Sequence, residues 1–447
     1  MSRVNRHRRW QALALAVLFT AVACGGGGTP SVSGTSFKGT KKIGYSGALS
    51  GGAALYGKAV SQALQMAVDE TNAKGGVNGY KLELDLQDDA TMVDKAVANT
   101  KQMILQDNVV AMFGPVTSAQ CAAASPVSKQ NKVIYLAATC NIYQLTTEPD
   151  LINPYYFSFV PNTYMEGIAA GVDAGKRGVK NIFIVSPKYV FGVSETNAFL
   201  AGLKKTNPSA KIVNAESTWY VPFPTNPNWG PTINQIQAAK PDMVYSNIFA
   251  ADQINFITQA LQVDPQFFQK YPMMTLSSLD ELRALGAKYP LGMRLYMRAP
   301  YFAIGASPSL DDFVKRYQAR WSELPSDWAV MDTDAFNTWV TAATAAKSFD
   351  GDKVRAQMAG KSFNSLRGPT ITLRIGDQQA DVGETIGTTA DSGGKFPFPT
   401  LTDIVALNGD ETIEPVQLMN ELRDGKCEKT AGDPTTTDFT ACPSYGK

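Results

Sequence analysis

Five cysteines and one histidine carry the most reactive side chains of this 447-residue sequence, and their positions limit the chemistry of the chain. The histidine, His7, precedes a short apolar run at the amino terminus and is lost if the chain is cut after that run. Ser-His-Asp and Cys-His catalysis and His-ligated zinc are then excluded. No CxxC pair or Cys/His cluster suggests a metal site, so we expect no enzyme, no metal and no cofactor.

One alternative is an enzyme that works with paired carboxylates. Asp88 and Asp89 are adjacent, and adjacent residues of a strand point to opposite faces, so they form a poor acid–base pair. A turn or a helix cap explains these two residues better.

The amino terminus has the pattern of a secretory signal peptide. Four arginines precede an apolar run at 12–19, and Ala21-Val22-Ala23 then leads into Cys24. The apolar run is too short to span a bilayer. A cysteine at the cut site, followed by four glycines, resembles the lipobox of bacterial lipoproteins, which implies a lipid on Cys24. The alternative is an ordinary cleaved signal with an incidental cysteine.

We therefore expect a signal peptide at 1–23 and a lipid-anchored flexible spacer at 24–40, rich in Gly, Ser, Thr and Pro. The lipid would hold the protein on the extracytoplasmic face of the cell membrane. No later stretch has the roughly 20 continuous apolar residues of a spanning helix.

The charge balance argues against nucleic acid. The sequence has 41 Lys and Arg against 40 Asp and Glu, and four of the basic residues lie in the predicted signal. Removing them leaves a small negative net charge with interspersed signs, unlike a nucleic-acid-binding surface. No nucleic-acid partner is expected.

The four remaining cysteines are consistent with export. An even number in an oxidising compartment suggests two disulfides. Sequence proximity favours Cys121–Cys140 and Cys427–Cys442, although four cysteines allow three pairings and free buried thiols are the alternative.

Strand and helix patterns alternate in two series along the chain. Apolar or alternating strand patterns, separated by segments with helical spacing, recur at 43–49, 82–86, 109–113, 133–137, 181–186, 211–215, 241–246 and 273–276. Such alternation predicts an α/β fold with parallel sheets in two Rossmann-like lobes. The segment 376–395 is rich in Gly, Thr and Asp and is predicted to be loop and hairpin.

Several segments together resemble the branched-chain amino-acid-binding proteins of ABC importers, which have the type I periplasmic-binding fold. They are IGYSGALSGGAALYG, AKGGVNGYKLEL, FGPVTSAQCAAASPV, YLAATC and KPDMVYSN, in that order. The resemblance implies two lobes joined by three hinge crossings, near Phe159, Arg298 and Leu373. It places 41–160 and 299–372 in lobe 1 and 161–298 and 373–422 in lobe 2, and leaves 423–447 as a disulfide-stapled tail.

The first wall of the expected site is the turn before a helix at Ser118. Ligands of open parallel sheets bind beyond the carboxyl ends of the strands, and a helix N-terminus favours a carboxylate. The resemblance implies that the ligand's carboxylate is held by four residues, Ser118, Ala137, Ala138 and Thr139. Plain helix capping is the alternative role of Thr117 and Ser118.

Aromatic residues are expected to form the other walls. The resemblance places Tyr56 against the ligand, with Phe191 and Phe249 closing over it from lobe 2. Family members often have tyrosine at the last two positions, and phenylalanine keeps the apolar face but loses the hydroxyl. Ordinary packing is the alternative for all three.

Ser277 is the main departure from the family pattern, because amino-acid binders usually have a carboxylate there to pair with the ligand's ammonium. A buried ammonium without a counter-charge is strongly disfavoured. Asp252, Asp280 or Glu281 could substitute, although acids at a helix start are the simpler reading of each. This argues against an unmodified aliphatic amino acid and leaves amides, urea, short carboxylates and aromatic acids, which related proteins bind.

The resulting hypothesis is a monomeric solute-binding lipoprotein that captures a small molecule (an amino acid, amide or small carboxylate) by hinged closure and delivers it to the membrane permease of an ABC importer. The alternative is a sensor, in which the same closed clamp meets a membrane receptor. The sequence does not separate these two functions, because both use the cleft in the same way.

Overall fold

The computed structural model describes residues 36–223, 226–299, 302–305, 307–368, 370–431 and 433–445. Residues 37–447 form one compact unit. The predicted signal peptide, Cys24 and most of the predicted spacer lie outside the described residues. Within the described ranges, none of the helices has the length and apolar character needed to cross a bilayer.

The first sheet is wholly parallel, with strand order β2-β1-β3-β4-β5. Its central strands are buried apolar segments, because helices cover both faces. The strands are β1 (Thr40–Gly47), β2 (Lys81–Asp88), β3 (Ala111–Phe113), β4 (Ile134–Ala137) and β5 (Tyr156–Ser158). The helices that connect these strands or join them later in the chain are α1 (Ala54–Ala73), α2 (Val93–Leu105), α3 (Ser118–Asn131), α4 (Gln144–Thr147), α11 (Pro308–Trp321), α12 (Asp327–Ala346) and α13 (Gly351–Arg355).

The second sheet has the order β15-β14-β11-β10-β9-β6-β7, with β8 also paired to β6. Its strands are β6 (Asn181–Pro187), β7 (Lys211–Ile212), β8 (Tyr220–Val221), β9 (Met243–Ser246), β10 (Met273–Leu276), β11 (Arg294–Met297), β14 (Glu384–Ala390) and β15 (Thr400–Leu407). Its helices are α5 (Thr163–Lys176), α6 (Val190–Thr206), α7 (Gly230–Ala239), α8 (Ala250–Val263), α9 (Phe267–Lys270), α10 (Leu279–Leu285), α14 (Gly409–Thr412) and α15 (Val416–Arg423). The predicted α/β class is therefore confirmed.

One edge of the second sheet departs from the predicted parallel pattern. β14 pairs antiparallel with β11, and β15 pairs antiparallel with β14. A hairpin can be added antiparallel through a short connection, whereas a parallel strand needs a crossover. Two small hairpins stand outside both sheets, formed by β12 (Ser362–Asn364) with β13 (Thr370–Thr372) and by β16 (Lys429–Thr430) with β17 (Asp433–Thr437).

Close packing of α5 on α6 positions the second lobe's wall of the site. Gly167 and Gly171 of α5 face the backbone of α6 so closely that a Cβ at either position would overlap Glu195 O or Phe199 O. Glycine is required there because it lets the two helix backbones approach. This contact fixes the start of α6, where Phe191 lies.

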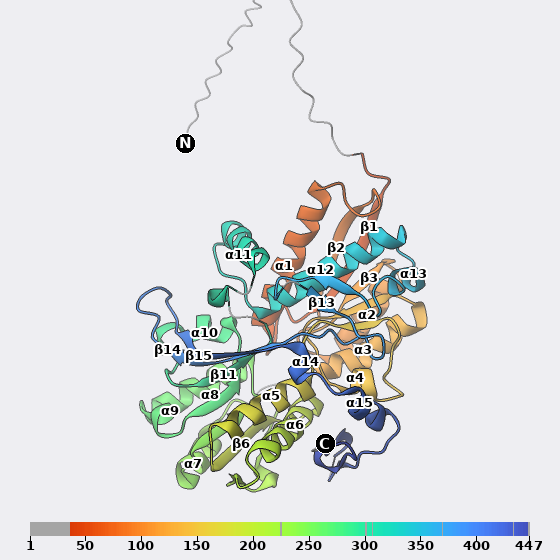
Figure 1. The fold of residues 1–447 in the computed structure, drawn as a ribbon. Coiled ribbons are helices and arrows are strands. Elements are labelled where there is room, and N and C mark those ends of the chain that lie inside the picture. Colours follow the sequence, from red (N-terminus) through yellow and green to blue (C-terminus); the bar gives the residue numbers. More distant parts are fainter. Residues whose placement is uncertain are drawn as a thin grey trace, which may run out of the picture. The chain divides into compact units, whose positions relative to one another are not determined.

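The chain passes between the two sheets three times, and the first and third crossings are bonded to each other. The first follows β5, the second follows β11 and the third precedes β14 (Figure 1). Ser158 N donates to Gln378 O at 3.1 Å, and Ala380 N donates to Ser158 O at 2.8 Å. These bonds hold the two crossing segments side by side.

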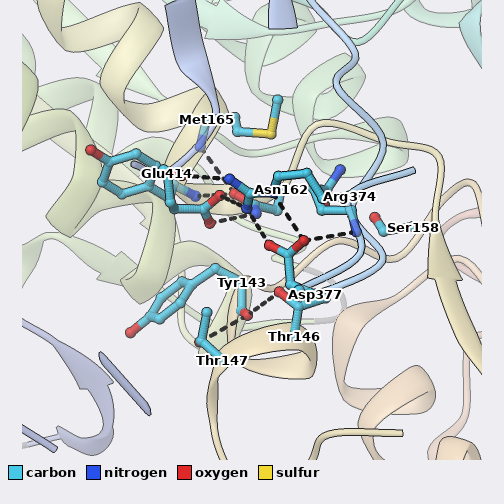
Figure 2. Close-up of polar contacts among 12 residues, drawn as sticks. Tyr143, Thr146, Thr147, Ser158, Asn162, Met165, Arg374, Asp377 and Glu414 are labelled. Atoms are coloured by element: carbon cyan, nitrogen blue, oxygen red, sulfur yellow. Dashed lines mark hydrogen bonds and ion pairs between the residues drawn. The ribbon is translucent and has the colours of Figure 1, made fainter. Parts of the chain in front are cut away.

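A buried polar cluster ties these crossings to the carboxyl-terminal helices. Asn162 caps α5 through its Oδ1 and donates from Nδ2 to Glu414 Oε1 at 2.5 Å. Arg374 lies between two carboxylates, those of Asp377 and Glu414 (Figure 2). Burial and the nearby Asp377 raise the pKa of Glu414 to about 7, although Arg374 opposes that rise.

The carboxyl-terminal tail folds against both sides of the hinge region. Both predicted disulfides, Cys121–Cys140 and Cys427–Cys442, are confirmed. The ring of Phe439 lies 5.0 Å from Tyr143, beside α4, and 5.0 Å from Tyr164 of α5. The second disulfide therefore closes a tail that packs on elements of both sheets.

Candidate ligand-binding cleft

Residues from both sheets enclose one cavity at the carboxyl ends of their strands. Its described lining residues are Tyr56, Val116, Ser118, Asn141, Tyr189, Phe191, Phe249, Arg298 and Trp328. The volume is about 10 Å³, enough for about one water molecule. A ligand larger than water therefore requires the walls to move apart.

The start of α3 forms the first wall. Thr117 is the N-cap residue, and its N–H and hydroxyl both donate to Gln120 Oε1, at 3.1 and 2.8 Å. Ser118 is the first residue of the helix and lines the cavity, where its Oγ accepts a bond from Asn141 N at 3.4 Å. Capping thus belongs to Thr117, and the hydroxyl of Ser118 stays directed at the cavity wall.

The segment after β4 supports this wall from behind. Ala137 and Ala138 are buried, and the hydroxyl of Thr139 donates to Pro115 O at 2.8 Å. The described cavity lining includes Asn141 but none of these three. The Cys121–Cys140 disulfide joins the segment to α3.

Five of the described lining residues carry aromatic rings. The sequence predicted Tyr56, Phe191 and Phe249, and the structure adds Tyr189 and Trp328. The Tyr56 ring lies 4.2 Å from Trp328 and 6.1 Å from Phe249, and Phe249 lies 5.6 Å from Phe191. The rings form a nearly continuous apolar surface around the cavity.

Arg298 is the cationic residue of the described lining. Its guanidinium carbon lies 4.9 Å from the Trp328 ring centre and 5.5 Å from that of Phe191. Its Nε donates to Glu166 Oε1, and Nη2 lies 3.3 Å from Glu166 Oε2. Burial lowers the pKa of Arg298 and the Glu166 carboxylate raises it, with a net rise, so the charge persists at all ordinary pH values.

Two more buried glutamates lie near this ion pair. Burial and repulsion by Glu166 raise the pKa of Glu195 and of Glu384 well above the usual range. Tyr296 donates to Glu195 Oε1 at 2.5 Å. These shifts favour the neutral forms of Glu195 and Glu384, and Glu166 is the glutamate whose carboxylate oxygens contact the Arg298 guanidinium.

Ser277 is absent from the described lining of the cavity and bonds within the second lobe. Its Oγ is 3.0 Å from Gln253 Oε1 and 3.1 Å from Tyr289 OH. The three acids considered as substitutes are also absent from the described lining. Asp252 accepts from Asn226 N at 2.8 Å, and burial raises its pKa to about 6.

Glu281 comes nearest to the cavity, because it contacts the wall residue Tyr56. Its Oε1 accepts from Tyr56 OH and from Ala250 N, the latter at 2.9 Å. Its Oε2 accepts from the N–H and the hydroxyl of Ser278, at 2.9 and 2.6 Å. A carboxylate has about four acceptor positions, so protein donors fill all of those on Glu281.

Asn141, Tyr189, Arg298 and Trp328 were not predicted as site residues. Asn141 follows the predicted AAT segment by two residues, and Tyr189 precedes Phe191 by two, so both could have been found by widening those segments. For Arg298, the sequence predicted only that a hinge crossing lies near it. Trp328 had no local signal, because it lies on α12, far along the chain from the other walls.

A sequence model of the family described as periplasmic binding protein matches residues 40–392. The chain belongs to this family. The predicted resemblance to branched-chain amino-acid-binding proteins is confirmed, as is the two-lobed type I fold. Leu/Ile/Val-binding protein BraC3 of Rhizobium johnstonii is 30% identical over 208 residues, which cover 45% of this chain and 53% of that protein. The match thus spans about half of that relative's length.

Two solved structures share the fold. A solute binding protein of an ABC transporter from Rhodopseudomonas palustris BisB5, in complex with 3,4-dihydroxybenzoic acid, has a TM-score of 0.71 and 22% identity over 83% of this chain and 98% of that one. An ABC-type branched-chain amino acid transporter from Rhodopseudomonas palustris CGA009 has a TM-score of 0.67 and 25% identity over 84% and 98% of the two chains.

Proposed function

We propose that this protein is an extracytoplasmic solute-binding lipoprotein that captures a small carboxylate with an apolar or aromatic body and delivers it to an ABC importer. The observation that carries the proposal is the buried Arg298, a permanent cation placed among aromatic rings between two lobes. The family is one of binding proteins, and the proposed role is accordingly to capture the ligand without altering it.

The carboxylate end of the ligand has three favourable contacts. Ser118 offers a hydroxyl, and the N-terminus of α3 offers a partial positive charge. Arg298 pairs through Nε and Nη2 with Glu166 and offers the ligand its Nη1, which lies 3.5 Å from Thr139 O. The rings of Tyr189, Phe191 and the other aromatic walls suit a flat or apolar body. Together they favour an anion with a hydrophobic portion.

Among the described residues of the cavity wall, an ammonium group has no equivalent partner. Ser277 bonds to Gln253 and Tyr289, and the acceptor positions of Glu281 are filled. An unpaired buried ammonium is strongly disfavoured. The fold neighbour in complex with 3,4-dihydroxybenzoic acid agrees with this ligand class.

A thermal-shift panel of matched compounds tests the ligand class. Benzoate and benzamide differ in the charge, and 3-phenylpropanoate and phenylalanine differ in the ammonium group. A ligand at a hundred times its Kd stabilises the fold by about 2.7 kcal/mol. We expect shifts with benzoate and 3-phenylpropanoate and none with benzamide or phenylalanine. A shift with phenylalanine or leucine alone would overturn the assignment.

The lipid anchor has its own test. Cys24→Ala removes the predicted lipid attachment site, so the variant should leave the membrane fraction and appear in the soluble extracytoplasmic fraction. Fractionation of cells expressing each form measures this. Continued membrane association of the variant would contradict the anchor.

A further inference from the structure

Helix α10 belongs to the second sheet but contacts the first lobe at several points. It connects β10 to β11, and its residues Leu279, Glu281 and Arg283 all reach elements packed on the first sheet. Leu279 N lies 3.4 Å from Asp327 Oδ1 at the start of α12. These are contacts across the cleft, and they exist only while the lobes are together.

The inner contact is buried and charge-assisted. Tyr56 of α1 donates its hydroxyl to Glu281 Oε1, and Ala250 N donates to Tyr56 OH at 3.1 Å. Tyr56 and Glu281 are both buried. Burial and the Glu281 carboxylate raise the pKa of Tyr56 well above its usual value, so the hydroxyl remains a donor.

The outer contact is an ion pair at the rim of the cleft. Arg283 Nη1 donates to Glu323 Oε2 at 2.8 Å, and Nη2 donates to Leu324 O at 2.9 Å. Lys58 of α1 holds the same Glu323 carboxylate at 3.0 Å from within the first lobe. Arg283 of the second lobe thus shares the Glu323 carboxylate with Lys58 of the first lobe.

We propose that α10 is a closure latch, in which Glu281 and Arg283 hold the lobes together and set the stability of the closed state without touching the ligand. The inference rests on the proposed capture of a solute by lobe closure. Tyr56 couples the two events, because its ring lines the ligand cavity and its hydroxyl forms the latch bond. A ligand larger than water moves the cavity walls, Tyr56 among them, so ligand entry and the latch bond act on the same side chain.

The latch variants separate the inner contact from the outer one. Tyr56→Phe keeps the ring and removes the hydroxyl, and should lower the closed-to-open ratio about 10-fold, as expected for a buried charge-assisted bond. Arg283→Gln removes a partly exposed ion pair and should lower the ratio about threefold, with the loss fading at high salt. The positioning role of Glu281 is tested by Glu281→Gln, which should resemble Tyr56→Phe.

A matched control is available in the first lobe. Arg320 of α11 pairs with Asp69 of α1 at 2.5 Å, and both residues belong to the same lobe. Arg320→Gln removes an exposed arginine ion pair that does not cross the cleft. It should leave the closed-to-open ratio unchanged.

The measurement is the distance between spin labels on the two lobes of the mature protein. Exposed Lys315 of α11 and Gln262 of α8, each replaced by cysteine, carry the labels while the native disulfides stay closed. Distance distributions are recorded with and without benzoate. We expect a closed population in the wild type that falls in the latch variants and persists in Arg320→Gln.

Two outcomes would overturn the latch: equal closed fractions in wild type and latch variants, or no closed population in the wild type under either condition. A different outcome would contradict only the proposed ligand class: benzoate leaves the closed fraction unchanged, while the latch variants still lower it. Circular dichroism spectra equal to the wild type confirm that each variant is folded.

Discussion

Ser118 is the residue whose role the structure sharpens most. Thr117 takes the capping position, which leaves Ser118 Oγ at the cavity wall with one long contact to Asn141 N. Ser118→Ala should therefore weaken binding of the panel's best carboxylate by about 1–3 kcal/mol, the cost of one hydrogen bond to a charged group. Titration calorimetry measures the loss.

Thr117→Val is the matched control for this prediction. It removes the hydroxyl that donates to Gln120 and should lower the free energy of unfolding by about 1 kcal/mol, the usual value for an N-cap. Its effect on affinity should be smaller than that of Ser118→Ala. Unchanged affinity in Ser118→Ala, together with lower stability, would assign Ser118 to the fold alone.

At the residue level, local motifs identified part of the site and long-range contacts supplied the rest. Tyr56, Ser118, Phe191 and Phe249 follow strands in recognisable segments and line one cavity. Ser277 has the expected place after β10, but its side chain bonds inward to Gln253. The position of a residue after a strand fixes where its backbone lies, and its hydrogen-bond partners decide the direction of its side chain.

At the element level, hydrophobic periodicity predicted the parallel strands because each is a buried apolar segment between helices. The residue composition of 376–395 predicted loop and hairpin where β14 lies, but not the strand β15 or the antiparallel pairing with β11, and exposed residues interrupt the pattern of β15. The pairing partner of such a strand depends on which edge strand of the sheet is free, here β11. The pattern of apolar residues does not indicate which strand forms that edge.

Helix α12 shows why one wall of the site was missed. It follows the second crossing and brings Trp328 within 4.2 Å of the Tyr56 ring, although about 270 residues separate the two positions. Its buried residues lie on all sides, so its pattern is that of an internal helix. Only the return of the chain to the first lobe places this helix at the cleft.

For the whole molecule, buried carboxyl groups link stability to pH. Burial raises the pKa of Glu414 to about 7, with Asp377 adding to the rise and Arg374 opposing it. Burial likewise raises the pKa of Asp280 and of Asp327 to about 7. The folded chain therefore holds protons that the unfolded chain releases between about pH 4 and pH 7.

The sign of this linkage gives the last prediction. Because the folded state binds more protons, the free energy of unfolding should fall as pH rises from 5 through the folded-state pKa of about 7. Glu414→Gln removes one titrating group between the crossings, so its slope should be shallower by up to about 1.4 kcal/mol per pH unit. Exposed Glu83 on β2 provides the control, since Glu83→Gln should leave the slope unchanged. Denaturant unfolding at pH 5, 6, 7 and 8 measures all three proteins, and parallel curves for wild type and Glu414→Gln would show that Glu414 stays ionised in the folded hinge.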